Sequence, residues 1–227
     1  MSAPSLRARV RSEMSQEIKA VARRHLATDG ANLSLRAVAR DLDIVASALY
    51  RYFPSRDALL TALIVDAYDD LAAAASAAES AVPRDDLRGR WLAACQGVRG
   101  WALAHPAEYG LIYGSPVPGY AAPQDTVEPA TKVILLLAAI VADAGDRLDP
   151  PPAPLPARLG SDLHRLIADR DGVATEEQLD RILVAWTHLY GVLSFEVFGR
   201  LDLMIEARAE YFEHHMHLMA DLAGLPA

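Results

Sequence analysis

Arginines, tyrosines and serines gather between residues 34 and 56, and these residue types are suited to binding a polyanion. Guanidinium groups form forked hydrogen bonds to phosphates, while hydroxyl groups bond to phosphate oxygens and to base edges. The side chains that spacing leaves on the outside are Arg36, Arg40, Ser47, Tyr50, Arg51 and Tyr52. This combination favours simultaneous contact with the backbone and the bases of a nucleic acid.

Signatures of catalysis are missing from the sequence. Cys95 is the single cysteine and has no identifiable base, and there is neither a nucleophile elbow nor a glycine-rich phosphate loop after a strand. His214 and His217 share a helical face, so with Glu210 and Glu213 they suggest either a metal site or a surface cluster near a helix end. We adopt the second interpretation and expect no enzyme, no metal and no cofactor.

The charge of the chain is unevenly distributed. Its 227 residues carry a net charge of −8, but residues 1–62 have a balance of +4 and the remainder a balance of −12. A basic first quarter would orient the chain toward a polyanion through one end. The 52% hydrophobic content is enough for a sizeable core, and no apolar run approaches the roughly 18 residues of a membrane span.

The amino-terminal arginines and the cysteine content bear on location. Arg7, Arg9 and Arg11 have no apolar stretch behind them, so they do not form a secretion signal. Cys95 alone can form no internal disulfide, which favours a reduced, cytoplasmic setting. The three arginines could reach neighbouring phosphates or a minor groove, or they could belong to a solvated disordered tail.

Helical patterns cover the chain, and no stretch alternates apolar with polar residues for long enough to predict a strand. Ser34 and Ser55 are suited to begin helices, Gly30 to end one, and Pro54 to interrupt one. We expect an all-α fold, with helices at about 11–28, from 35, 45–52, 56–80, 84–104, 106–113, 125–145, 158–169, 175–198 and 202–223, an irregular loop at 114–120 and a stiff connector at 150–156.

Residues 34–53 fit two short crossed helices that hold one face outward. The positions with the spacing of buried residues are Leu35, Val38, Ala39, Leu42, Ile44 and Leu49. A helix that enters the major groove must be held in this way by partner helices. The segment is therefore predicted to be a helix-turn-helix.

The run LYRYFPSRDALL at residues 49–60 resembles the signature that follows the recognition helix in the TetR family, and residues 34–44 resemble the family's preceding helix and turn. The resemblance implies that Ser34 and the first amides of its helix hold a phosphate and that Arg51, Tyr52 and Arg56 clamp the DNA backbone. Arg36, on the outside, is also expected to contact DNA. It places Ala46, Ser47, Ala48 and Tyr50 against the major groove. Two positions depart from the pattern: Asp43 stands where glycine is usual, and Val45 where a capping serine or threonine is usual.

The same resemblance implies a DNA-binding domain at residues 1–55 and a larger helical ligand-binding and dimerisation domain at 56–227. Residues 186–199, WTHLYGVLSFEVFG, resemble a carboxyl-terminal signature of one subgroup of the family. Aromatic side chains with one polar tip suit an amphipathic effector. The candidates for lining its cavity are Trp91, Cys95, Trp101, Tyr109, Tyr113, His188 and Phe195.

The last two predicted helices have apolar bands too broad for a helix with one solvent face. Pairing with a twofold mate would bury the excess as a four-helix bundle, although burial within the monomer is the alternative. The residues expected at this dimer interface are Leu179, Ile182, Trp186, Leu189, Tyr211, Phe212, Met216 and Met219.

Together these features predict a dimeric regulator that binds a twofold operator in double-stranded DNA. A small-molecule effector of unknown identity would release it, and repression is the expected sign of regulation. The alternative is a helical small-molecule-binding protein without sequence-specific DNA binding. The small side chains of Ala46 and Ala48 carry little information about the operator sequence.

Overall fold

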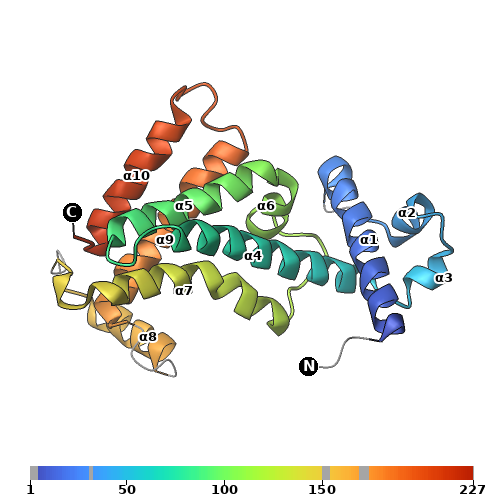
Figure 1. Ribbon diagram of the computed structural model, residues 1–227, viewed down its shortest axis with the longest axis horizontal. Coiled ribbons are helices and arrows are strands. Elements are labelled where there is room, and N and C mark those ends of the chain that lie inside the picture. The colour runs from blue at the N-terminus through green and yellow to red at the C-terminus, as the bar shows by residue number, and fades with distance from the viewer. Residues whose placement is uncertain (1–4, 31–32, 150–153, 169–173, 227) are drawn as a thin grey trace. The chain divides into compact units, whose positions relative to one another are not determined.

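The computed structural model describes residues 5–30, 33–149, 154–168 and 174–226. Within these ranges helices are the only regular secondary structure, as the all-α prediction required (Figure 1). None of the described helices is long and apolar enough to cross a membrane.

Ten α-helices and two short 3₁₀ turns follow one another along the described ranges. The α-helices are α1 (Leu6–Asp29), α2 (Leu35–Asp41), α3 (Ala46–Leu49), α4 (Arg56–Ser80), α5 (Leu87–Ala104), α6 (Pro106–Tyr113), α7 (Val127–Ala144), α8 (Ala157–Ile167), α9 (Glu176–Val197) and α10 (Arg208–Ala223). The 3₁₀ turns are η1 (Gln124–Thr126) and η2 (Gly145–Arg147).

The chain divides into two compact units that are not the two halves of the sequence. The first unit holds residues up to Tyr68 together with 105–129, and the second holds 69–104 and 130 onward. The division falls inside α4, between Tyr68 and Asp69, at the junction of α5 and α6, after Ala104, and inside α7, after Pro129. The expected domain boundary between residues 55 and 56 stays a prediction.

The core of the first unit is formed mainly by residues of the helices α1, α2, α3 and α4, together with one residue from the loop after α6. Ile18, Val38 and Leu49 are fully buried in it. Val117, from the loop after α6, is buried in the same cluster. The hydroxyl groups of Tyr120 and Thr61 lie 2.9 Å apart, which fixes this loop to α4. Residues 105–129 are therefore part of the framework that holds the helix-turn-helix.

Ion pairs fasten α1 to its neighbours in the first unit. The Asp66 carboxylate on α4 accepts from Lys19 Nζ at 2.6 Å and from Arg23 Nη2 at 2.8 Å. Lys19 is buried, so the loss of Asp66 would leave a buried ammonium group without its partner. His25 Nε2 lies 2.7 Å from Asp41 Oδ2, which connects α1 with α2.

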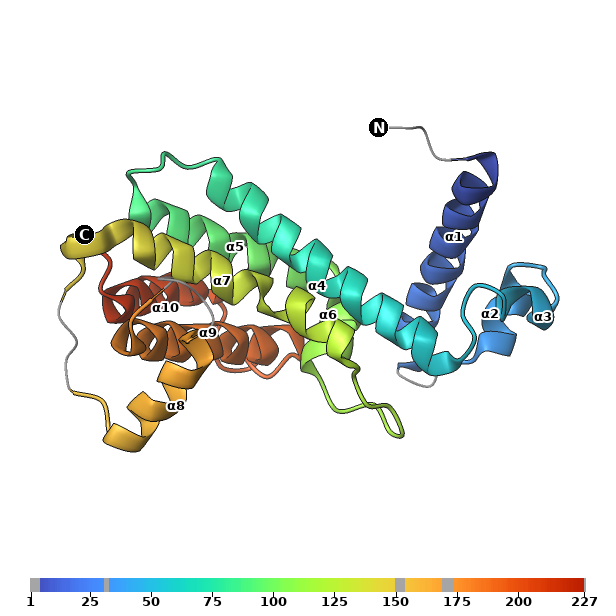
Figure 2. The ribbon, with the colours of Figure 1, turned by 90° about the horizontal axis from the view of Figure 1, so that it is seen from below.

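The second unit is built around α5, α9 and α10, with α10 packed against both other helices (Figure 2). Trp91 is buried, and its indole N–H donates to the Met216 carbonyl at 3.2 Å. Arg90 is also buried and donates to Glu79 at 2.6 Å and to Asp143 at 2.8 Å. The buried charge of Arg90 is tolerated because the two carboxylates pair with it.

Two helix starts differ from the sequence prediction. α1 begins at Leu6 instead of about residue 11, because the Ser5 hydroxyl caps it by accepting from the Ala8 amide at 3.3 Å. The three amino-terminal arginines are thus helical, and the disordered-tail alternative is wrong for them. α10 begins at Arg208 instead of about residue 202, because a positive φ at Gly199 opens a run of turns. The predicted connector at 150–156 lies largely outside the described residues.

Candidate nucleic-acid interface and surface pocket

The turn between α2 and α3 has the geometry expected of a helix-turn-helix. Ser34 begins α2, with its hydroxyl accepting from the Ala37 amide at 3.4 Å. Asp43 is the one non-glycine residue with a positive φ, 53°, among the residues whose backbone is described. Its left-handed conformation lets the Ile44 amide donate back to the Ala39 carbonyl at 3.0 Å. Asp43 thus adopts the left-handed conformation at the turn position where the TetR pattern usually has glycine.

α3 is a short helix with one buried anchor and an exposed outer side. Leu49 is fully buried, whereas Tyr50 has 45% of its surface exposed and Ser47 is exposed. Ala46 and Tyr52 pack partly against the core, so they have less surface to offer than the sequence suggested. Val45 precedes the helix without a side-chain cap, as its residue type predicted.

The remaining predicted DNA contacts surround α3 within the first unit. Arg36, Arg40 and Arg51 are exposed. Arg56 is half-buried at the start of α4, where its guanidinium lies 3.6 Å from the Asp57 carboxylate. The Ser55 hydroxyl accepts from the Ala58 amide at 3.0 Å and so fixes the start of this helix.

The residues that were expected to line an effector cavity belong to both units. Trp91, Cys95 and Trp101 are buried in the second unit. Burial raises the pKa of the Cys95 thiol to about 12. Tyr109 and Tyr113 belong to the first unit, where their ring centres lie 5.2 Å apart.

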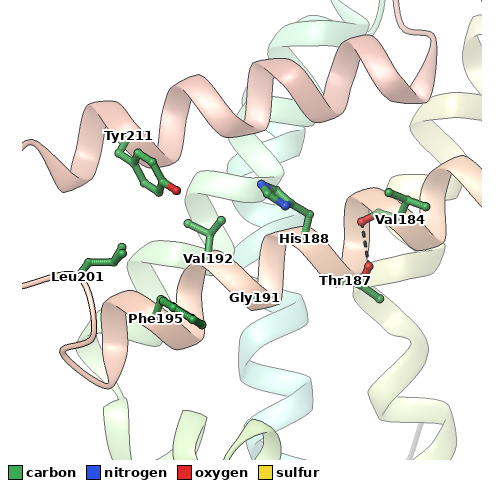
Figure 3. A pocket seen from close by; sticks show the side chains of 8 residues that line it. All are labelled: Val184, Thr187, His188, Gly191, Val192, Phe195, Leu201 and Tyr211. Carbon is green, nitrogen blue, oxygen red and sulfur yellow. Dashed lines mark hydrogen bonds between the residues drawn. The ribbon is translucent and has the colours of Figure 1, made fainter. Parts of the chain in front are cut away.

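The other two candidates, His188 and Phe195, both line an open pocket of about 420 Å³ in the second unit (Figure 3). The lining residues are Val184, Thr187, His188, Gly191, Val192, Phe195, Leu201 and Tyr211. Most come from one face of α9, while Tyr211 reaches in from α10 (Figure 3). Gly191 leaves the helix backbone open at this face, since nothing lies within 4 Å of a Cβ placed there.

A pair of histidines joins α9 to α10 beside this pocket. His188 Nε2 lies 2.7 Å from His215 Nδ1. The pKa of His188 is lowered by burial and then by His215, and the pKa of His215 is lowered by burial and then by His214. Among the residues searched, no group of three or more His, Cys, Asp or Glu side chains is arranged to hold a metal ion.

The residues expected at a dimer interface differ in how far the protomer itself covers them. Ile182, Leu189, Phe212 and Met216 are buried inside the protomer and have almost no surface for a partner. Leu179, Trp186, Tyr211 and Met219 are half-buried. The exposed apolar residues of these helices, Val184, Phe195 and Leu218, were not among the predicted contacts.

Comparison with known proteins agrees with the helix-turn-helix. Residues 18–63 match the family of bacterial regulatory proteins of the tetR family, and residues 91–219 match the tetracyclin repressor-like, C-terminal domain. The HTH-type transcriptional regulators Rv1816 of Mycobacterium tuberculosis and Mb1846 of Mycobacterium bovis are each 40% identical to the chain over 196 residues. That match covers 84% of this chain and 83% of each relative. The chain belongs to the TetR family.

Solved structures extend this result to the fold. The crystal structure of the regulatory protein SCO4313 superimposes with a TM-score of 0.77 at 34% identity, covering 96% of this chain and 100% of that one. A tetR-family regulatory protein from Rhodococcus RHA1 shares the fold with a TM-score of 0.61 at 16% identity, covering 94% of this chain and 98% of that one. This member of the TetR family is thus a DNA-binding transcriptional regulator, and its family is one of regulators rather than of enzymes.

Proposed function

We propose that this TetR-family regulator is a dimeric repressor that a small-molecule effector releases from a twofold operator. The observation that carries the proposal is the outer side of α3, where Ser47 and Tyr50 are exposed on a helix that Leu49 anchors in the core. A short helix held in this way can enter a major groove without losing its position.

The proposed DNA contacts divide into base-reading and backbone-holding residues. Ser47 and Tyr50 reach the base edges from α3, with Ala46 and Ala48 as small neighbours that admit close approach. Hydroxyl groups make fewer directed contacts to bases than arginine or asparagine does. Part of the specificity is therefore expected to come from the shape of the operator.

The backbone-holding residues stand on both sides of α3. They are Ser34, Arg36, Arg51, Tyr52 and Arg56. Because the Ser34 hydroxyl already caps α2, a phosphate there would be held by the first amides of the helix. The Arg56 guanidinium forms forked bonds to a phosphate where a lysine would supply a point charge.

The proposed dimer uses the outward face of α9 and α10. On α9 the exposed positions 184, 187, 191 and 195 recur every three or four residues, which places them on one helical face. On α10 the half-buried positions 211 and 215 and the exposed position 218 recur in the same way. Val184, Phe195 and Leu218 are each more than 40% exposed in the protomer. A second copy of this helix pair would cover them and would occupy the pocket over Gly191.

The proposed release mechanism runs through α4. This helix begins at Arg56 beside the DNA contacts and continues into the second unit without a break. An effector that prefers another shape of the second unit would move α4 and thereby change the spacing of the two recognition helices. In a dimer those helices must stand about 34 Å apart to reach successive major grooves.

The test begins with sequencing the DNA fragments that the purified protein retains. The recovered operator should bind more tightly than a random duplex at physiological salt. Tyr50→Ala combined with Arg56→Ala should abolish operator binding and leave the dimer intact. If the protein shows no preference for any retained sequence, the alternative of a helical small-molecule-binding protein without specific DNA binding is correct.

The effector part needs a separate measurement. Compounds that raise the melting temperature of the protein are added to the preformed operator complex. Release of the operator at the concentrations that stabilise the protein supports the proposal. Stabilisation with no effect on the operator complex contradicts it.

A further inference from the structure

A second surface of the first unit has the chemistry of a nucleic-acid contact. A cleft of about 460 Å³ lies between the beginning of α1 and the turn that follows α3. Its lining consists of Leu6, Arg7, Val10, Arg11, Arg51 and Tyr52. The Arg11 guanidinium donates to the Arg51 carbonyl at 3.3 Å and lies 5.7 Å from the centre of the Tyr52 ring. The cleft is therefore continuous with the end of the recognition helix.

The lining combines positive charge with exposed carbon surface. It contains three guanidinium groups and no carboxylate. Within the described ranges, the guanidinium groups of Arg7 and Arg51 make no hydrogen bond or ion pair, so both are free for an anion. Leu6 is 75% exposed and Val10 is 51% exposed, although both are apolar.

We propose that this cleft holds one strand of the sugar–phosphate backbone of the duplex whose major groove receives α3. The proposal rests on the DNA binding proposed above and adds α1 to the contact surface. A nucleic-acid backbone alternates phosphates with apolar deoxyribose rings, which fits a cleft with both kinds of lining. Arg7 and Arg51 bond to phosphates, while Leu6 and Val10 pack against sugar carbons. Arg11 is a positioning residue, because it holds the two walls together.

The test compares two arginines on the same helix. Arg7 lines the cleft and Arg9 lies outside it, and both are exposed. Arg7→Gln and Arg9→Gln each remove one charge and introduce a good helix former. Binding of each variant and of the parent is measured with the operator duplex and with a random duplex, between about 50 and about 200 mM salt. Thermal unfolding of all three proteins is recorded alongside.

We expect Arg7→Gln to make the dependence of log affinity on log salt shallower by about 0.9 for each protomer bound. The loss should be the same for operator and random duplex, because backbone contacts carry no base preference. Arg9→Gln should match the parent within about twofold.

Three results would overturn the assignment of the cleft. Equal binding by the two variants would mean that the cleft does not touch DNA. A loss confined to the operator would mean that Arg7 contacts bases. A melting temperature lowered in Arg7→Gln alone would give the residue a structural role. Failure of the proposed function is a separate result, since it requires the parent protein itself not to prefer the operator.

Discussion

A substitution at Gly191 can test whether the pocket on α9 faces a second copy of the chain. In the protomer, nothing lies within 4 Å of a Cβ placed at Gly191, and the same holds for Gly100 on α5. Both glycines are exposed and lie within helices. Replacing either by leucine should therefore stabilise an isolated protomer, because glycine costs a helix interior roughly 0.5 to 1 kcal/mol.

The two substitutions should differ in a dimer. If a partner covers Gly191, the new leucine side chain meets packed atoms, and overpacking of this kind costs about 1 to 3 kcal/mol. A twofold interface contains the substitution twice, so dimerisation should lose about 2 to 6 kcal/mol. At 1.4 kcal/mol for each factor of ten, the dimer dissociation constant should rise by at least about 25-fold.

Sedimentation velocity over a dilution series measures this constant for Gly191→Leu, for Gly100→Leu and for the parent. The expected result is a weaker dimer in the first variant only, together with operator binding that requires higher protein concentration. Equal dissociation constants for the two variants would refute the placement of the pocket over Gly191 in the dimer interface. The surface of α9 around Phe195 would then be open to a ligand instead.

Three further predictions concern single groups. Asp43 has a φ of 53°, which glycine adopts without strain and alanine does not. Asp43→Gly should therefore raise the free energy of unfolding by about 1 kcal/mol, and Asp43→Ala should lower it; urea denaturation measures both. The pKa values of His188 and His215 are lowered in the folded state, so the unfolded chain takes up protons first as the pH falls. The contribution of these histidines to the free energy of unfolding is complete above about pH 6.5 and should be lost as the pH drops through the lowered pKa values. Melting temperatures between about pH 5 and pH 8 should show this fall in the parent and a smaller one in His215→Gln; identical profiles would contradict it. Cys95, with its pKa raised to about 12, should not react with a thiol reagent at neutral pH until the protein unfolds, and rapid reaction of the native protein would contradict its burial.

Local signals account for the parts of the structure that the sequence predicts well. Ser34 and Ser55 cap the helices that follow them, and Asp43 adopts the left-handed turn expected at its position. Each of these depends on hydrogen bonds and backbone sterics within a few residues. The helix-turn-helix could therefore be recognised without knowing what packs behind it.

The orientation of α9 and α10 could not be predicted in the same way. A broad apolar band shows that a helix is covered on more than one side, but it does not say which part faces its own protomer. The prediction selected Ile182 and Phe212 for the partner, and both are fully buried in the protomer. Val184 and Phe195, which are exposed, lie on the side of α9 opposite Ile182, as a period of about 3.6 residues requires for these positions.

Long-range packing explains the largest difference between sequence and structure. Val117 lies far along the chain from the helix-turn-helix, yet it is buried in the same core as Leu49 and Leu60. No local pattern marks such a contact, because a valine in a loop is compatible with either unit. The chain passes between the units three times, twice within a continuous helix (α4 and α7) and once at the junction of α5 and α6. We therefore expect the release mechanism proposed for α4 to act along α7 as well.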